Sequence, residues 1–215
     1  RTKMNNFKRA ILYCILLAPA LNAQTFYPAQ KPHCADVNCT ADVKVYPFQL
    51  DEVHLSDGKF KKAMETDKRF LLKLEPDRLL SSFRANAGLA PKAEKYGGWE
   101  SMGLAGHSLG HYISALSLLY ASEKDQEVLQ RINYCIAELK EIQDYRKSGY
   151  LGAIPDEDRL WEEVKSGKIE TGNFSLNGFW APWYTVHKIM AGLLDAYIYT
   201  ENKEALDIQM GFSDW

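Results

Sequence analysis

Several features that define specialised protein classes are scarce in this 215-residue chain. Four cysteines are too few for a disulfide scaffold, and eight prolines with 14 glycines exclude a collagen-like or low-complexity chain. Charge of one sign is also lacking, because 26 basic residues against 28 acidic ones leave a net charge of −2 and no basic stripe. Binding to nucleic acid or to an anionic membrane would need such a stripe, so neither partner is expected. With 46% hydrophobic and 25% charged residues, the composition is that of a globular protein.

The signatures of several common enzyme classes are missing as well. The chain has no GxGxxG after a predicted strand, no Walker sequence, no GxSxG elbow and no CxxC pair with zinc spacing. These absences argue against a dinucleotide-dependent oxidoreductase, a nucleotide-dependent enzyme and a serine hydrolase.

A secretory signal is predicted at the N-terminus. Residues 1–3 are interpreted as an upstream remnant, residues 5–9 are basic, residues 10–21 form an apolar run, and Ala23 offers a small residue for cleavage. We therefore expect residues 1–23 to be removed after Ala23 and the protein to be exported to the periplasm or the medium. The alternative is a buried N-terminal helix. The run is shorter than the ~20 residues of a transmembrane helix, so no membrane association is expected after cleavage.

The cysteines do not suggest a catalytic centre. Cys14 lies within the predicted signal, and Cys34 and Cys39 lie in a predicted extended linker, residues 24–44. The latter two either close a small disulfide loop, as an exported protein permits, or remain free thiols. Cys135 falls on the apolar side of a predicted helix, where a buried and unreactive thiol is expected.

Helical periodicity dominates the chain from Asp57 onward. Ser56 or Asp57 is the expected cap of the first helix. The helices are predicted at about residues 57–74, 76–87, 107–121, 125–145, 158–166, 181–200 and 204–215. Strand signals are confined to residues 43–53, which predict a short β or extended segment. The expected fold class is mainly α.

A weak internal repeat relates two of the predicted helix junctions. Residues 120–129 and 197–206 share Tyr, Glu and Leu at matching positions, and each joins a long helix to a second one. Repeated helix pairs predict either an α-solenoid or a closed α/α toroid. Because a closed toroid has about a dozen helices, the chain would be roughly the first half of one.

The first candidate site is a histidine pair, His107 and His111, one turn apart on a predicted helix. This spacing suits metal binding, contact with another ligand, or a purely structural role. Ser108 stands where a metalloprotease motif has glutamate, so the pair supplies no general base.

The second candidate is a group of aromatic residues at a predicted helix start, Trp180, Trp183 and Tyr184, with His187 within the next turn. Sugar rings pack on such flat faces while their hydroxyls bond to the polar tips. An aromatic core cluster is the alternative.

The third candidate is Glu100, which ends the glycine-rich loop YGGWE. A carboxylate beside tryptophan is suited to accept a sugar hydroxyl or to act as an acid/base group. The alternative is a solvated loop carboxylate.

In its ordered motifs the chain resembles the N-terminal part of the catalytic domain of the β-L-arabinofuranosidase group, glycoside hydrolase families 127 and 146. The resemblance covers residues 45–215 and rests on YPFQL, DGKFKKAMETDKRFLLKLEPDRLLSSFRANAGL, YGGWE, GHSLGHYISALS, GYLGA and WAPWYTVHKIMAGLLDAY.

The resemblance implies an (α/α)6 toroid followed by β-sandwich domains, in exported bacterial enzymes that cleave β-L-arabinofuranosyl residues from plant glycans. These are retaining enzymes with a cysteine nucleophile in a zinc site of three cysteines and a glutamate, and a separate glutamate is the acid/base.

Those catalytic and zinc-binding motifs lie further along the family fold and match no cysteine of this chain. Residues 45–215 are therefore expected to be a truncated half of the catalytic domain, inactive alone, without catalytic or metal-binding residues. The resemblance carries over only a sugar-binding wall, formed by Glu100, His107, His111, Trp180, Trp183, Tyr184 and His187.

Two other interpretations remain. The chain is either a non-catalytic glycan-binding or helical-repeat interaction protein, or a metalloenzyme that uses His107, His111 and His187. The oligomeric state is not predicted.

Overall fold

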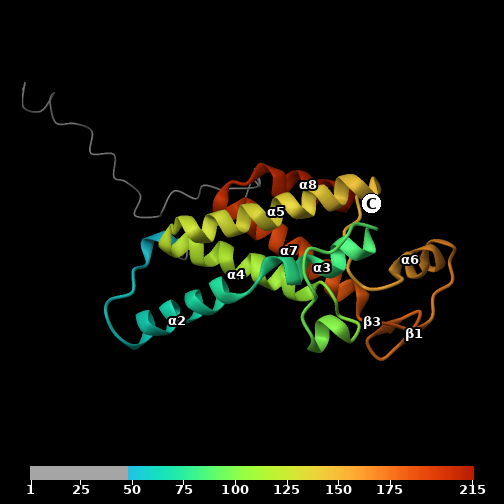
Figure 1. Ribbon diagram of the computed structural model, residues 1–215, viewed down its shortest axis with the longest axis horizontal. Helices are drawn as coiled ribbons and strands as arrows, with labels where there is room; N and C mark the ends of the chain where they lie inside the picture. Colours follow the sequence, from blue (N-terminus) through green and yellow to red (C-terminus); the bar gives the residue numbers. More distant parts are fainter. Residues whose placement is uncertain (1–47) are drawn as a thin grey trace, which may run out of the picture. The chain divides into compact units, whose positions relative to one another are not determined.

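The computed structural model describes residues 48–215, and it is mainly helical, as predicted (Figure 1). The predicted signal and linker, with Cys14, Cys34 and Cys39, lie outside the described residues. In chain order the elements are η1 (Leu50–Glu52), α2 (Lys59–Lys73), α3 (Pro76–Asn86), η2 (Gly98–Ser101), α4 (His107–Glu123), α5 (Gln126–Arg146), α6 (Glu157–Lys165), β1 (Thr171–Gly172), β2 (Ser175–Leu176), β3 (Phe179–Trp180), α7 (Pro182–Thr200) and α8 (Lys203–Asp214).

The prediction of a strand is wrong for residues 48–53, the part of that segment that is described. These residues contain the 3-10 turn η1, and Phe48, Leu50 and Val53 are all exposed, so no buried face stabilises a strand. The strands are instead β1, β2 and β3, which form a small antiparallel meander before α7. Asn177 supports its second turn with a positive φ of 49° and a side chain that accepts from the Glu170 N–H.

The predicted internal repeat is a repeated helical hairpin, α4–α5 and α7–α8. Both first helices end at a residue in the left-handed conformation, Lys124 with φ 52° and Glu201 with φ 57°. The N–H of Lys124 donates to the Tyr120 carbonyl at 2.8 Å, and that of Glu201 donates to the Tyr197 carbonyl at 2.9 Å. The tyrosines shared by the two sequences therefore occupy equivalent positions in the two turns.

The second helix of each hairpin begins with a side-chain cap. The Asp125 carboxylate accepts the N–H groups of Glu127 and Val128, and the Asn202 amide oxygen accepts the N–H of Ala205. Both cap residues are extended, with φ near −70°, as a residue before a helix usually is.

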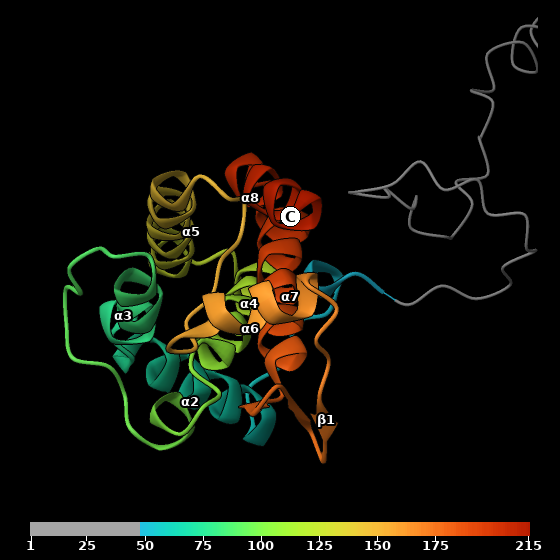
Figure 2. The same cartoon turned by 90° about the vertical axis from the view of Figure 1, so that its right-hand side faces the viewer.

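Helices α4 and α7 lie in the middle of the described residues, with α5 and α8 beside them (Figure 2). They approach so closely that a Cβ on Gly110 would lie 2.1 Å from the Lys188 carbonyl oxygen. A Cβ on Gly192 would lie 2.7 Å from the Gly110 carbonyl oxygen. Only glycine fits at these two positions, and the contact brings the first turns of α4 and α7 together.

The apolar face predicted for α5 packs into the core. Val128, Ile132, Ile136, Leu139 and Ile142 are buried there, and Leu129 lies half-buried beside them.

Cys135 on the same face is a free and fully buried thiol, as predicted. Burial raises its pKa to about 12, so the thiol stays neutral.

Helix α2 contrasts with these packed helices, because none of its residues is buried. Phe60 is 80% exposed and Phe70 is 60% exposed. The helix begins after Gly58 without a side-chain cap, so the expected cap at Ser56 or Asp57 is wrong, and Asp57 pairs instead with Lys61 at 3.1 Å.

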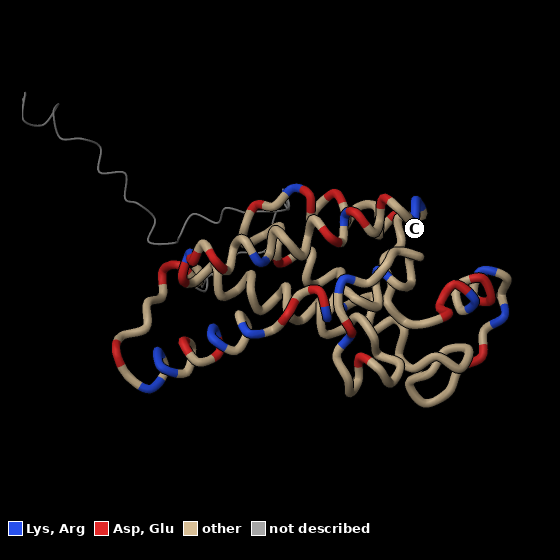
Figure 3. The backbone as a smooth tube through the Cα atoms, in the orientation of Figure 1, with Lys and Arg blue, Asp and Glu red and all other residues tan. Residues whose placement is uncertain are grey.

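Charged residues of both signs are interspersed along the described part of the chain (Figure 3). Of the helices described, none is both long enough and apolar enough to cross a membrane.

Candidate functional site

Five rings from three separate segments meet near the first turns of α4 and α7, and we call them the histidine–aromatic cluster: Trp99, His107, His111, Trp180 and Tyr184. His107 lies at the centre, with ring centroids 5.9 Å from Trp99, 6.1 Å from His111 and 6.0 Å from Tyr184. Trp180 contacts Trp99 edge-on at 6.4 Å. Four of the seven residues predicted to bind sugar are thus brought together.

Glu100 secures the start of α4. Its Oε2 accepts the N–H of Gly106 at 2.7 Å, and its Oε1 accepts the N–H of Ser108 at 3.0 Å. The side chain is buried, and its charge is favourably placed at the positive end of the helix dipole. The alternative of a solvated loop carboxylate is therefore wrong, and both oxygens of Glu100 are engaged with the protein.

His107 is held in one orientation by the same loop. Its Nδ1 lies 2.5 Å from the Leu104 carbonyl oxygen and 3.0 Å from Oε1 of Glu100. Because a carbonyl oxygen can only accept, we assign the Nδ1 as protonated. In the neutral ring the Nε2 is then the acceptor, and the nearest polar atom given for it is the Ser108 Oγ at 3.5 Å.

His111 is exposed and its Nε2 lies 3.1 Å from the Tyr184 hydroxyl. The pKa of His111 is lowered, first because part of its ring is removed from water, and then by the charges of Lys188, His107 and His187. The Lys188 ammonium also lies 5.2 Å from the centre of the Tyr184 ring. His111 is therefore favoured as a neutral hydrogen-bonding group at neutral pH.

Trp183 and His187 do not belong to the cluster. Trp183 packs against Trp161 of α6, with ring centroids 4.8 Å apart. It lines a separate cavity of about 530 Å³ together with Met190, Phe212 and Trp215. His187 is exposed and acts on the cluster through its charge near His111.

Three residues of the site were not singled out from the sequence. Trp99 directly precedes Glu100 in the glycine-rich loop, and this aromatic neighbour was the available signal. Lys188 stands four residues after Tyr184, on the same side of α7, which is a periodicity signal. The Leu104 carbonyl, which orients His107, left no signal because any residue supplies a backbone carbonyl.

The residues described offer no set of three or more His, Cys, Asp or Glu side chains that could hold a metal ion. His107, His111 and His187 are thus not arranged as a three-ligand metal site.

Comparison with known families places this geometry in context. A family model described as "Beta-L-arabinofuranosidase, GH127 catalytic domain" matches residues 52–215, which include every helix from α2 to α8 and the whole cluster. No curated protein matches the chain. Because the family model matches most of the sequence, the chain belongs to the GH127 β-L-arabinofuranosidase catalytic-domain family.

Proposed function

We propose that the chain is part of an exported glycosidase that removes arabinofuranosyl residues from plant-derived glycans, and that the histidine–aromatic cluster is one wall of its sugar pocket. The main support is the meeting of imidazole, phenol and indole groups at the first turns of α4 and α7. Such a surface offers flat apolar faces beside polar tips, which is the combination that sugar rings need.

The residues of this wall are proposed to divide the work. His111 and Tyr184 exchange hydrogen bonds with sugar hydroxyls, because both are exposed polar groups on the open side of the cluster. Trp99 and Trp180, which are 60% and 40% exposed, present their faces to the sugar ring. Glu100 acts as a positioning residue, since its carboxylate holds α4 and His107.

The other two predicted contacts take outer positions. His187 contributes from the rim near His111, and Trp183 contacts a glycan only through its own cavity beside Trp161.

The family resemblance implies retaining hydrolysis by a zinc-bound cysteine nucleophile, and the residues described do not fit that role. Cys135 is fully buried and neutral, and residues 48–215 contain no suitable metal-binding group. We therefore propose that residues 48–215 bind sugar, and that the zinc ligands, the nucleophile and the acid/base are supplied by another part of the enzyme. By itself the chain is expected to hydrolyse nothing.

We also propose that the hairpins belong to a toroid. On α7 an apolar stripe at helical spacing continues along the helix: Trp183, Val186, Met190, Leu194 and Tyr197. Leu194 is 42% exposed and Trp183 is 55% exposed, although Ile189, Leu193 and Ala196 of the same helix are buried. A further hairpin of the same repeat would cover this stripe, as α7 covers α4.

Sugar binding can be tested with the 215-residue chain, with L-arabinose and methyl β-L-arabinofuranoside as probes in ligand-detected NMR. We expect binding that is lost in His111→Ala and kept in His54→Ala, a matched change of an exposed histidine outside the cluster. Binding that survives His111→Ala would contradict the assignment of the wall. Release of arabinose from a β-L-arabinofuranoside by the chain alone would show that it carries its own catalytic residues.

Export is a separate proposal that rests on residues 1–23, and it is tested by expression in a bacterial host. The exported fraction is expected to begin at Gln24, as read by N-terminal sequencing. A Leu16→Arg variant, which interrupts the apolar run, should remain inside the cell. Retention of the unaltered protein in the cytosol would reject the signal.

A further inference from the structure

Next to the histidine–aromatic cluster lies a small cavity of about 270 Å³, which we call the inner cavity. Its lining includes Glu100 and Gly103, Pro155, and Phe179 and Trp180 of β3. Trp180 also packs on Trp99, so the same indole borders the inner cavity and belongs to the cluster.

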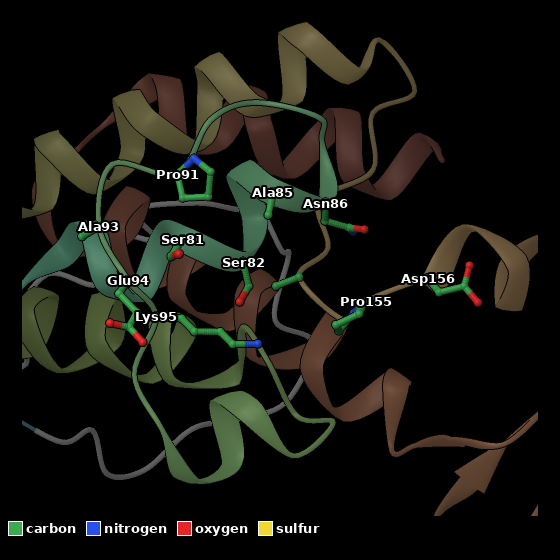
Figure 4. Close-up of a pocket in the computed structure, with 11 residues that line it drawn as sticks. Ser81, Ser82, Ala85, Asn86, Pro91, Ala93, Glu94, Lys95, Pro155 and Asp156 are labelled. Atoms are coloured by element: carbon green, nitrogen blue, oxygen red, sulfur yellow. The ribbon is translucent and has the colours of Figure 1, made fainter.

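A larger cavity of about 540 Å³ lies between α3, the loop of residues 91–95 and the turn before α6 (Figure 4). We call it the α3 cavity. Lys95 and Pro155 line both cavities, which therefore adjoin. The cluster, the inner cavity and the α3 cavity thus follow one another, and we call this series the path: Trp180 borders the first two, and Lys95 and Pro155 border the last two.

Hydroxyl groups form part of the inner surface of the α3 cavity. Ser81 and Ser82 are only 5% and 8% exposed, and among residues 48–215 no hydrogen bond is formed by either hydroxyl. Lys95 extends beneath α3 toward the space beside Ser82 (Figure 4). Within the described part of the chain, its ammonium forms no ion pair. These groups are free to bond with a ligand that brings its own hydroxyls.

The charges at the edge of the α3 cavity favour a neutral ligand. Asp156 is paired with Arg159 at 3.0 Å, which leaves Glu94 against Lys95 and no excess of positive charge to attract phosphates or acidic peptides. Apolar atoms of Ala85, Pro91 and other small residues cover the remaining wall. A mixed surface of this kind, with a volume inside the ~300–1,000 Å³ of small-molecule sites, suits an uncharged carbohydrate.

We propose that this path is a groove for the rest of the glycan, so that the enzyme acts on oligosaccharides whose further sugar units occupy the inner cavity and the α3 cavity. The inference rests on the proposed function, because it assigns the cluster to the terminal arabinofuranosyl unit. Trp180 stacks on the sugar where the path leaves the cluster, and Ser82 and Lys95 bond to a more distant one.

Calorimetric titration of the full chain with methyl β-L-arabinofuranoside and with a β-L-arabinofuranosyl trisaccharide tests the groove. We expect the trisaccharide to bind at least about tenfold more tightly, since it alone can reach the α3 cavity. Lys95→Ala should remove most of this advantage and leave the monosaccharide affinity unchanged. Ala85→Trp, which fills the cavity from an exposed helix position, should do the same.

Matched controls are Lys62→Ala and Ala63→Trp on the exposed surface of α2, and both should keep the advantage. Equal affinity for the two sugars would overturn the groove and leave the sugar-binding wall intact. An advantage that survives both cavity variants would also overturn it. Absence of binding for both sugars would overturn the wall and the groove together.

Discussion

The two hairpins, α4–α5 and α7–α8, match closely at their turns and differ at their opposite ends. At the turn end, Lys124 and Glu201 adopt the same left-handed conformation within about 5° in φ and ψ, and Asp125 and Asn202 both cap the following helix. At the opposite end the two hairpins share little. Helix α4 starts after Gly106, with Glu100 holding its first N–H groups, whereas α7 starts with Pro182 after the strained Ala181.

This difference separates the turns from the end of the repeat that holds the proposed sugar-binding wall. The turn fixes how the two helices of a hairpin pack, so its geometry is constrained in both copies. The opposite end is free to vary in loops, and there the two copies place His107 and Tyr184 against each other. The proposed sugar-binding wall is therefore carried by the starts of α4 and α7.

Gly110→Ala tests the contact that brings the two starts together, and the largest effect is expected from it. The new Cβ would lie 2.1 Å from the Lys188 carbonyl oxygen, so α4 and α7 must separate, which should lower the free energy of unfolding by about 3 kcal/mol or more. Urea unfolding followed by circular dichroism measures it. Gly97→Ala, where no atom lies within 4 Å, is the control, and equal stability of the two variants would contradict the close approach.

Glu157→Gln probes a buried carboxyl group at the start of α6. Glu157 is 1% exposed and accepts a hydrogen bond from the Tyr150 hydroxyl at 2.8 Å. Burial raises the pKa of Glu157 to about 7, from an ordinary value of 4.5. The folded state therefore favours the protonated acid. Its contribution to stability is fully present below pH 4.5 and is lost as the pH rises through 7.

Between pH 5 and pH 8 this loss amounts to at most roughly 3 kcal/mol, and the neutral amide avoids it. Glu157→Gln should therefore match the unaltered protein at pH 5 and exceed it in melting temperature at pH 8. The lowered pKa of His111 acts in the opposite direction, so the difference between the two proteins at each pH is the quantity to measure. If the melting temperature of Glu157→Gln had the same pH dependence as that of the unaltered protein, the raised pKa of Glu157 would be contradicted.

Glu100→Ala removes the anchor that only the first hairpin has. Two N–H groups at the start of α4 lose their acceptor and His107 loses a neighbour, so we expect destabilisation by about 2 kcal/mol together with loss of sugar binding. Glu94→Ala, which removes an exposed carboxylate from the same loop, should change stability by less than about 0.5 kcal/mol. Sugar affinity unchanged in Glu100→Ala would mean that His107 needs no positioning.

Asp125→Ala and Asn202→Ala compare the conserved turn end in the two copies, and the smallest effects are expected there. Each removes one helix cap and should lower stability by about 1 kcal/mol, with Asp125 the larger because it also pairs with Lys68. Thermal melts of the two variants beside Asp57→Ala, which caps no helix, measure the difference. If one of the two variants lost almost no stability, the two turns would not be equivalent.

The helices and the repeat could be predicted because both depend on local periodicity. The β-meander could not, because Phe174 and Asn177 adopt positive φ values in its turns, which is uncommon for residues other than glycine. For residues 48–53 the sequence predicts a strand that the structure lacks, because their apolar side chains are exposed and pack against no core.

The candidate site could be predicted in part. His107 and His111 share a face of α4, so their proximity follows from a spacing of four residues. Trp183 and Tyr184 are neighbours on α7 and therefore diverge by about 100°, which takes Trp183 to the α6 side, as the structure shows. The burial of Glu100 depends on how the loop folds back over the start of α4, and no local pattern encodes that return.

The glycine contact between α4 and α7 also bears on the order in which the chain folds. Each hairpin needs only sequence neighbours to form, whereas Gly110 meets Gly192 only after α5, α6 and the β-meander have been looped out between them. Closing so long a loop slows folding, although helical proteins usually assemble quickly. The two hairpins are thus expected to form early, and their docking through this contact is expected to set the folding rate.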